Sequence, residues 1–305
     1  LTLWVDPDLR EIGAGVWEDV PWGQLLHDHR DSLAAFLRCD PDWHIEGSER
    51  FAQVRARIQR AVQRIAAAHP NQTVAAVSHG CAIKTGLSAW LGMGVEDIGQ
   101  IPLPDNTAVA KLEVEDGQVK VVYYNDNSHL CSLAVPAQVP GRDYALSGVE
   151  ANGLRYAPLP LPQEEARYLS AREDGWQADL GSLSGFDGPA LASQAAQAAS
   201  QDPDSVLLAL LGDTPVGILQ MDWQRDAGQG AGWISFLYMF PEFRKKGLSV
   251  QLLGQAICGG RAMGRQYLRV CCPPGSQVAR SFFSAHGFVA KGGSDILEKY
   301  IGLEL

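Results

Sequence analysis

The sequence predicts an α/β protein of two domains, and two passages from a strand into a helix carry this prediction. In the first passage, the short apolar run at residues 73–78 leads through His79 and Gly80 into apolar residues at helical spacing. In the second, the apolar and aromatic run at residues 233–240 leads through a short basic loop into apolar residues at helical spacing from Leu248 onward. A length of 305 residues divides most simply into two domains.

The composition is that of an ordinary globular protein, with 46% hydrophobic and 20% charged residues. A net charge of −10 argues against nucleic acid as a partner, because phosphate contacts need a basic face and only Arg244, Lys245 and Lys246 form a compact basic cluster. No apolar run reaches membrane-spanning length, and no charged-then-apolar leader opens the sequence. We therefore expect a cytoplasmic protein without a nucleic-acid or membrane partner.

The six cysteines show no paired spacing of the type that binds zinc, and Cys271 and Cys272 are adjacent. We interpret them as reduced thiols, as in cytoplasmic proteins. The sequence therefore predicts neither disulfides nor a metal site.

The first passage places a histidine where a ligand can bind. Apolar residues at helical spacing over residues 51–65, interspersed with arginines, predict a surface helix that Gly47 and Ser48 cap. Residues 73–78 suit a strand buried on both faces. His79 would then lie at the carboxyl end of this strand and at a helix start, where open α/β sheets bind ligands and anions. A lone histidine there is more often a turn or core residue, and both interpretations stay open at this point.

Five segments of the first 130 residues occur in an order known from one family. They are Leu9-Arg10-Glu11-Ile12, Gly15 with Trp17-Glu18, Ser78-His79-Gly80, Leu103-Pro104-Asp105-Asn106-Thr107 and Tyr124-Asn125-Asp126-Asn127-Ser128-His129-Leu130. Together they resemble the later half of the histidine phosphatase (phosphoglycerate mutase-like) superfamily. The resemblance implies a partial three-layer α/β fold in which two histidines and two arginines surround the transferred phosphoryl group. By motif, it implies that Glu11 is the proton donor and His79 the second histidine.

The sequence departs from this family at a decisive point. The Arg-His-Gly tripeptide that carries the family's nucleophilic histidine has no counterpart here. Without the nucleophile no phosphohistidine forms, so we expect no phosphatase activity from this chain. The portion without a counterpart also contributes a central strand in the family, and its loss leaves neighbouring strands with unpaired ladder groups. We therefore expect the segment to lean on the second domain, on a second copy in a homo-oligomer, or on residues outside this sequence, which begins at Leu1 rather than at Met.

A connector rich in Pro and Gly separates the two parts. Residues 135–142 show no sustained period, and a second Pro-rich piece at residues 158–162 follows a short strand-like run at residues 154–157. We place the boundary near Glu150, which gives domains at residues 1–149 and 150–305.

The second part predicts helices and strands in a mixed order. Helices are expected at residues 163–176 and 189–200, and turn residues 212–215 join the runs 206–211 and 216–223 into a hairpin. The strand at residues 233–240 and the helix from Leu248 follow. The order ends with a strand at residues 267–272, a helix at residues 277–286 capped by Gly287, and strands through Phe288 and residues 300–303.

This order resembles the GNAT superfamily of N-acetyltransferases, an α/β fold with a mixed central sheet. The run Arg244-Lys245-Lys246-Gly247-Leu248-Ser249 is similar to the family's acyl-CoA pyrophosphate loop, Q/R-x-x-G-x-G/A, with Ser249 in place of the last small residue. Residues 279–288 are similar to a second signature, A-x-x-F/L-Y-x-x-x-G-F. A helix N-terminus receives phosphate groups well, because its backbone N–H groups lack intrahelical partners.

The resemblance to GNAT proteins implies a set of cofactor-binding residues. These are Tyr238, Met239, Arg244, Lys245, Lys246, Gly247, Leu248 and Ser249. The cofactor is acetyl-CoA as acyl donor, and the second substrate is an amine that attacks the thioester directly. The backbone N–H of Met239 is implied as the oxyanion donor.

This sequence lacks two groups that often transfer protons in the GNAT family. The family's tyrosine that protonates the leaving thiolate falls at Phe283, which has no proton to give. We interpret Phe283 as a core aromatic residue. Residues 233–239 contain no carboxylate to act as a base, and the nearest carboxylates in sequence are Asp222 and Glu242.

Three functions follow from these resemblances. The first is an acetyl-CoA-dependent N-acetyltransferase, in which Tyr238, Ser284 or water carries the proton. The second is a histidine phosphatase or a bifunctional enzyme in a longer chain. The third is a non-catalytic module that senses acyl-CoA. We expect the first, with an acceptor that the sequence does not identify.

Overall fold

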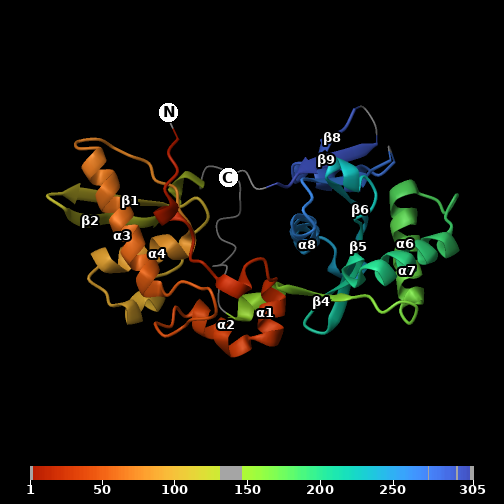
Figure 1. Cartoon of the computed structure of the whole chain (residues 1–305), viewed down its shortest axis with the longest axis horizontal. Coiled ribbons are helices and arrows are strands. Elements are labelled where there is room, and N and C mark those ends of the chain that lie inside the picture. The colour runs from red at the N-terminus through yellow and green to blue at the C-terminus, as the bar shows by residue number, and fades with distance from the viewer. Residues whose placement is uncertain (1–2, 131–145, 274, 293–294, 303–305) are drawn as a thin grey trace. The chain divides into compact units, whose positions relative to one another are not determined.

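The computed structural model describes residues 3–130, 146–273, 275–292 and 295–302 (Figure 1). The chain divides into two compact units, one made of Leu1–Val20 and Asp28–Val149 and the other of Pro21–His27 and Glu150–Leu305. The predicted connector at residues 135–142 lies outside the described residues. None of the described helices is long and apolar enough to cross a membrane.

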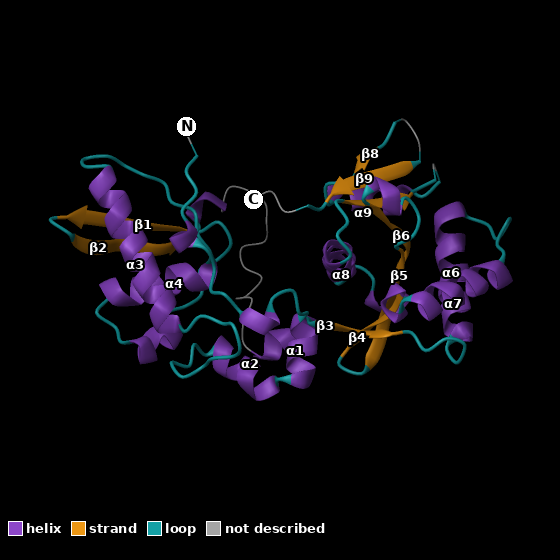
Figure 2. Ribbon diagram, in the orientation of Figure 1, coloured by secondary structure: helices purple, strands orange, loops and turns teal. Residues whose placement is uncertain are grey.

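The first unit combines helices with a two-stranded hairpin among its described residues. Its helices include α2 (Arg30–Leu37), α3 (Phe51–Ala68) and α4 (Gly80–Trp90), and its strands are β1 (Val109–Glu115) and β2 (Gln118–Asp126). Figure 2 shows the two strands as a pair of adjacent arrows. They pair antiparallel across Asp116 and Gly117, which both have positive φ. Two successive residues of this conformation suit the tight turns that match strand twist.

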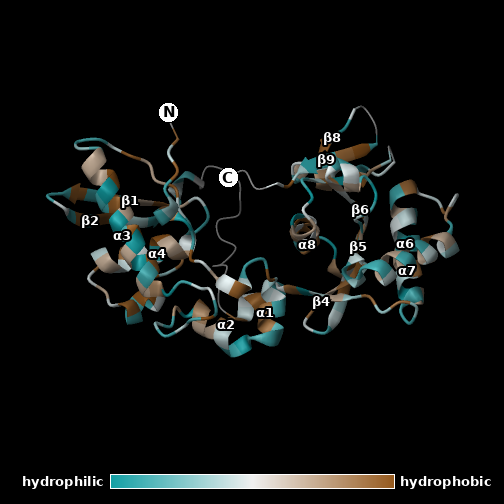
Figure 3. Ribbon diagram, viewed as in Figure 1, coloured by the Kyte–Doolittle hydropathy of each residue, from teal (hydrophilic) through white to brown (hydrophobic). Residues whose placement is uncertain are grey.

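Helix α3 confirms the predicted helix but corrects its start. Apolar side chains at helical spacing, Phe51, Val54 and Ile58, are buried along one face. Figure 3 shows hydrophilic and hydrophobic residues interleaved along the helix, as expected for an amphipathic element. The residue before the helix is Arg50 rather than the predicted Gly47 and Ser48, and its backbone N–H donates to the Gln53 side chain at 2.8 Å.

Arg57 of α3 is buried, which corrects the prediction of an arginine-bearing surface for this helix. Its side chain is 3% exposed. The guanidinium forms two hydrogen bonds of 2.9 Å to the Glu49 carboxylate and donates to the backbone carbonyls of Asp8, Arg10 and Glu11. A buried cation is tolerated when it is paired and hydrogen-bonded in this way. Arg57 therefore fixes the loop that carries Glu11.

Residues 73–78 do not form the predicted buried strand. They carry no strand pairing, and Val77 is 88% exposed. The physical reason is that a strand is defined by its partners. Within the described part of the first unit, β1 and β2 pair only with each other, so no ladder reaches residues 73–78. Their apolar composition fits a strand, but composition alone supplies no hydrogen bonds.

The second unit is built on a seven-stranded mixed sheet. Its strands are β3 (Leu154–Pro158), β4 (Val206–Leu211), β5 (Thr214–Asp222), β6 (Ala231–Met239), β7 (Tyr267–Cys271), β8 (Val289–Ala290) and β9 (Ile296–Tyr300). They lie in the order β3-β4-β5-β6-β7-β9-β8. All neighbours are antiparallel except β6 and β7, which are parallel. The predicted mixed sheet and the hairpin β4–β5 are confirmed.

Helices cover both faces of this sheet. They are α6 (Glu165–Leu180), α7 (Gly188–Gln201), α8 (Ser249–Ala262) and α9 (Gln277–Ala285), while α1 (Trp22–Asp28) falls almost wholly in this unit and α5 (Leu146–Asn152) lies at the boundary. Tyr168 of α6 packs with Ile218 and Tyr238 on one face. Leu253 of α8 and Phe283 of α9 pack in a core cluster on the other. Figure 1 shows α6 and α7 on one side of β5 and β6, and α8 on the opposite side.

Candidate active site

Strands β6 and β7 pair along only half of β6, which leaves an open edge. The parallel pairing joins residues 231–234 to residues 267–270 and does not continue to Met239. Opposite β5, Met221 pairs with Ile234 and Gln220 with Phe236, so Ser235 is an extra residue in β6. Such a bulge bends the strand and often re-aims groups near functional sites. From Ser235 onward, β6 therefore offers backbone groups that β7 does not use.

The backbone N–H of Met239 points toward this open edge. On the β5 side, the N–H of Phe240 donates to the Val216 carbonyl at 2.9 Å. Because backbone groups alternate along a strand, Met239 must direct its N–H to the other side, and Leu237 does the same. The structure thus places the predicted oxyanion donor on the open edge and adds a second donor, Leu237, that sequence reasoning missed.

The loop between β6 and α8 presents a row of unpaired backbone donors. Lys245 and Gly247 have φ values of 62° and 75°, and α8 begins at Ser249. The N–H groups of residues 245–250 donate no hydrogen bond to any described residue. Alternating backbone conformations of this kind form concave anion sites, and the first turn of a helix strengthens them. The predicted loop is therefore suited to an anion in its main chain.

The side chains of this loop divide into two groups. Lys245 and Lys246 are exposed and bring positive charge to the donors. Leu248 is buried beside Met239 and Leu252 and so anchors the loop to the core. Ser249 is the first residue of α8, and the N-cap residue before it is Leu248, which makes no side-chain capping hydrogen bond.

Arg244 and Tyr238 both contact Asp174 of α6, a residue that sequence reasoning missed. The Arg244 guanidinium forms an ion pair with Asp174 and donates from Nε to the Met239 carbonyl at 3.0 Å. The Tyr238 hydroxyl donates to the same carboxylate at 2.7 Å. These bonds, first from Arg244 and then from Tyr238, lower the pKa of Asp174. Arg244 therefore fixes the loop to β6 and α6, and Tyr238 lies buried between the sheet and α6.

Glu11 and His79, the two predicted phosphatase residues, meet at the start of α4. The Glu11 carboxylate accepts hydrogen bonds from the backbone N–H groups of Cys81 at 3.1 Å and Ala82 at 2.8 Å. His79 precedes α4 and is exposed, and its side chain makes no hydrogen bond to a described residue. The helix terminus that we expected to attract a phosphate is thus occupied by a carboxylate of the same chain.

Comparison with known families assigns the two parts separately. The model of the histidine phosphatase superfamily (branch 1) matches residues 1–127, and the model of the acetyltransferase (GNAT) family matches residues 169–288. The chain joins a histidine phosphatase segment to a GNAT domain. No curated protein matches the chain.

Several solved structures are similar to one part of the chain. YhfR from Bacillus stearothermophilus is 30% identical, with a TM-score of 0.39, over 41% of this chain and 62% of its own length. The chain therefore spans less than two thirds of YhfR. PaiA N-acetyltransferase from Thermoplasma acidophilum, solved with coenzyme A, is 17% identical with a TM-score of 0.38, covering 48% of this chain and 98% of PaiA. YncA from Salmonella typhimurium, a putative acetyltransferase solved with acetyl-CoA, is 15% identical with a TM-score of 0.38, covering 50% of this chain and 96% of YncA. TM-scores below 0.5 add nothing to the family matches.

Phe283 of the GNAT domain is a core residue, as interpreted from the sequence. It is 5% exposed and packs edge to face against Phe282 and Phe288. Asp222, one of the two carboxylates considered as a base, accepts backbone hydrogen bonds from Gln224 and Arg225 in the turn after β5. A hydroxyl at position 283 would therefore be buried in an apolar cluster rather than presented to a ligand.

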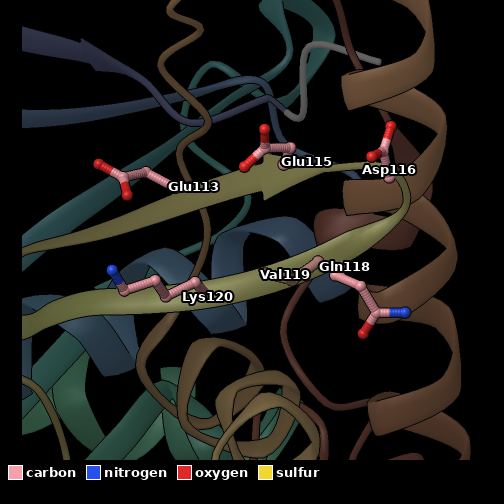
Figure 4. A pocket seen from close by; sticks show the side chains of 6 residues that line it. All are labelled: Glu113, Glu115, Asp116, Gln118, Val119 and Lys120. Carbon is pink, nitrogen blue, oxygen red and sulfur yellow. The ribbon is translucent and has the colours of Figure 1, made fainter.

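One surface hollow in the described residues lies away from every predicted site residue. It has a volume of about 410 Å³ and lies at the tip of the β1–β2 hairpin. Figure 4 shows its lining, which consists of Glu113, Glu115, Asp116, Gln118, Val119 and Lys120. Their side chains stand apart along the two strands rather than converging on one point. We assign this hollow no part in the chemistry.

Replacing Asp174 should remove a modest, pH-dependent contribution to stability. Both partners of the Asp174–Arg244 pair are about 40% exposed, so we expect a coupling of about 0.5 kcal/mol at pH 7. Because the folded state lowers the pKa of Asp174, this contribution is present above the ordinary carboxyl pKa and is lost as the pH falls through the lowered value. Urea unfolding of Asp174→Asn, Arg244→Gln and the double variant gives the coupling. A coupling unchanged down to pH 3 would contradict the ion pair.

Replacing Glu11 should weaken the start of α4. Glu11→Ala leaves the N–H groups of Cys81 and Ala82 without their acceptor, and losing a cap of this kind costs about 1 kcal/mol. Amide hydrogen exchange in the first turn of α4 should accelerate in the variant. Glu18→Ala, which removes another carboxylate from the same loop, is the control and should leave α4 exchange unchanged. Equal exchange in Glu11→Ala and the unaltered chain would refute the capping role.

Proposed function

We propose that the GNAT domain binds acetyl-CoA at the open edge of β6 and transfers the acetyl group to an amine. The observation that carries this proposal is the set of unpaired N–H groups of residues 245–250, next to the open edge that begins at Ser235. The loop can hold a pyrophosphate, and the edge can receive an extended chain through backbone hydrogen bonds. We place this domain at residues 150–305 and the phosphatase-like domain at residues 1–149.

The residues of the chain have distinct tasks in this proposal. The main chain of residues 245–250 binds the pyrophosphate, and Lys245 and Lys246 add positive charge there. Acetyl-CoA, when bound, supplies an activated thioester. The N–H group of Leu237 would stabilise the negative charge that develops on the thioester oxygen as the neutral amine attacks. The N–H group of Met239, about 7 Å further along the same edge, is too far away to share that oxygen and would bind the extended part of the cofactor. Arg244, through Asp174 and the Met239 carbonyl, holds the loop in position against β6.

The proposed reaction requires no strong general acid from this domain. The Tyr238 hydroxyl donates to Asp174, and burial together with this carboxylate raises the pKa of Tyr238, so Tyr238 keeps its proton. Ser284 is exposed on α9. The leaving group is a thiolate, and an ordinary thiol has a pKa of about 8.5, so it can depart near neutral pH without a strong acid. We infer that water takes the proton of the amine.

Titration of the full chain with acetyl-CoA, followed by a screen of amines, tests the proposal. Isothermal titration calorimetry should show one site per chain. Thiol release from acetyl-CoA should rise above the amine-free rate with at least one class of amine. Absence of binding would refute the proposal. Binding without turnover across a broad panel would favour the module that senses acyl-CoA. Phe283, which stands where the family's acid is expected and has no proton to give, fits that alternative.

We propose that the phosphatase-like domain of this chain is catalytically silent. The sequence lacks the Arg-His-Gly tripeptide, and the Glu11 carboxylate occupies the start of α4 beside His79. The chain should not hydrolyse p-nitrophenyl phosphate above background, and His79→Ala should make no difference to the rate. Hydrolysis that disappears in His79→Ala would instead support a bifunctional enzyme.

A further inference from the structure

Arg172 of α6 lies beside the bulge at which the open edge of β6 begins. Its Nη1 donates to the carbonyl of Ser235, the bulge residue, at 3.1 Å. Its guanidinium carbon lies 4.0 Å from the ring centre of Phe236, the next residue of β6. Arg172 therefore stands next to the first backbone groups that β7 leaves unused.

The charge of Arg172 has no carboxylate partner among the residues that the structure describes. Besides Ser235, its guanidinium donates to the Tyr168 hydroxyl at 2.8 Å and to the Gln220 side-chain oxygen at 2.7 Å, both of which are neutral. It forms no ion pair with any carboxylate among the described residues, since Asp174, two positions along the helix, pairs with Arg244 instead. Burial lowers the pKa of Arg172. A partly buried cation without an anion is costly, and a carboxylate is the group that best offsets it.

The guanidinium also keeps hydrogen-bonding capacity. Arginine has five N–H donors, and three hydrogen bonds from Arg172 to described residues account for three of them. The Tyr168 hydroxyl and the Gln220 oxygen are hydrogen-bonded to each other at 2.8 Å and are buried, so the guanidinium is held rigidly. A rigid, planar donor with two N–H groups to spare suits the two oxygens of a carboxylate.

We propose that Arg172 binds a carboxylate of the acceptor, so that the acceptor is a small amine that carries a carboxylate, as an amino acid does. This inference rests on the proposed acetyl transfer at β6. Ser235 and Leu237 are two residues apart, which corresponds to about 7 Å along a strand. A carboxylate at Arg172 and an amine at the thioester beside Leu237 would thus be separated by only a few bonds. Arg172 is a specificity-determining residue in this arrangement.

Acetylation of free amino acids compared with their amides tests this inference, because an amide lacks the negative charge. An amide also makes the α-amine less basic, so the decisive quantity is the change in acid-over-amide preference between the unaltered chain and Arg172→Gln, in which this difference cancels. The unaltered chain should prefer the best amino acid over its amide by at least tenfold in kcat/KM. Arg172→Gln should lose this preference through a higher KM for the acid, while kcat/KM for the amide and the affinity for acetyl-CoA stay within threefold. Arg167→Gln, on the exposed side of the same helix, is the matched control and should keep the preference.

The outcomes separate this inference from the proposed function. Equal use of acids and amides by the unaltered chain would confirm acetyl transfer but overturn the role of Arg172. A loss in Arg172→Gln that is equal for acids and amides would show that Arg172 only positions the bulge. If no amine is acetylated, calorimetry with N-acetylamino acids and their amides still tests whether Arg172 binds a carboxylate. Binding of the acids alone, lost in Arg172→Gln, supports the carboxylate site, and binding of neither overturns it.

Discussion

Gly247→Glu is expected to reduce the affinity for acetyl-CoA at least a hundredfold. Gly247 lies in the row of unpaired donors with a φ of 75°, and a side chain there has open space within 4 Å. A glutamate would direct a negative charge and five heavy atoms at the place where the pyrophosphate must bind. A hundredfold loss corresponds to about 2.8 kcal/mol, within the range of a like charge placed in a charge-binding site. Isothermal titration calorimetry measures this loss directly.

Gly264→Glu provides a matched control for this experiment. Gly264 follows the other end of α8, has a φ of 66°, and also has no neighbouring atom within 4 Å of an added side chain. Both substitutions force a non-glycine residue into the left-handed region, at a cost of about 1–2 kcal/mol in stability. The two variants should therefore unfold at similar urea concentrations, but only Gly247→Glu should fail to bind. Equal binding by both variants would remove the loop from the acetyl-CoA site.

Arg57→Ala is expected to destabilise the first unit by about 3 kcal/mol, because it removes the buried partner of Glu49 and the donor to three backbone carbonyls. In the variant, Glu49 keeps only Arg10 and the Gly13 N–H as partners among the described residues. The carbonyls of Asp8, Arg10 and Glu11 lose the Arg57 donor. Although burial alone would raise the pKa of Glu49, hydrogen bonds led by Arg57 lower it. The effect should therefore be full at neutral pH and should decline as the pH falls through this lowered value.

Hydrogen exchange resolved by unit can measure the effect of Arg57→Ala without assuming a single unfolding transition. Exchange in α3 and in the loop around Glu11 should accelerate by two orders of magnitude or more, and exchange in the GNAT domain should not change. The control is Arg60→Ala, since Arg60 is 61% exposed and contacts Asp8 at 3.6 Å, which predicts a change below about 0.5 kcal/mol. Similar exchange in the two variants would refute the buried network.

Elements defined by short-range patterns were predictable from the sequence. The apolar spacing of α3 and α8 and the turn chemistry of the β4–β5 hairpin depend on residues close in the chain. The strand predicted at residues 73–78 was wrong, because a strand needs partner strands and composition does not specify them. The β1–β2 hairpin was missed although Asp116-Gly117, flanked by alternating residues, is a strong turn signal.

The residues of the site follow the same distinction between contacts that are local in the sequence and contacts that are not. Gly247 and the loop around it follow a contiguous motif and were predictable. Asp174 and Arg244 are 70 positions apart, and Arg172 and Ser235 are 63 apart. No local periodicity in the sequence predicts such pairs, because they form only when α6 packs against β6. The bulge at Ser235 is likewise a property of strand register, which no single strand encodes.

The unpaired donors of residues 245–250 belong to the main chain, and this determines which genetic changes the site can tolerate. Exchanging the exposed side chains of Lys245 or Lys246 leaves all six N–H groups in place. Deleting or inserting one residue between Phe243 and Leu248 would instead displace the donors of residues 245–247 relative to those that follow Leu248, because Leu248 stays anchored in the core. Among natural variants of this loop, length should therefore vary far less than sequence.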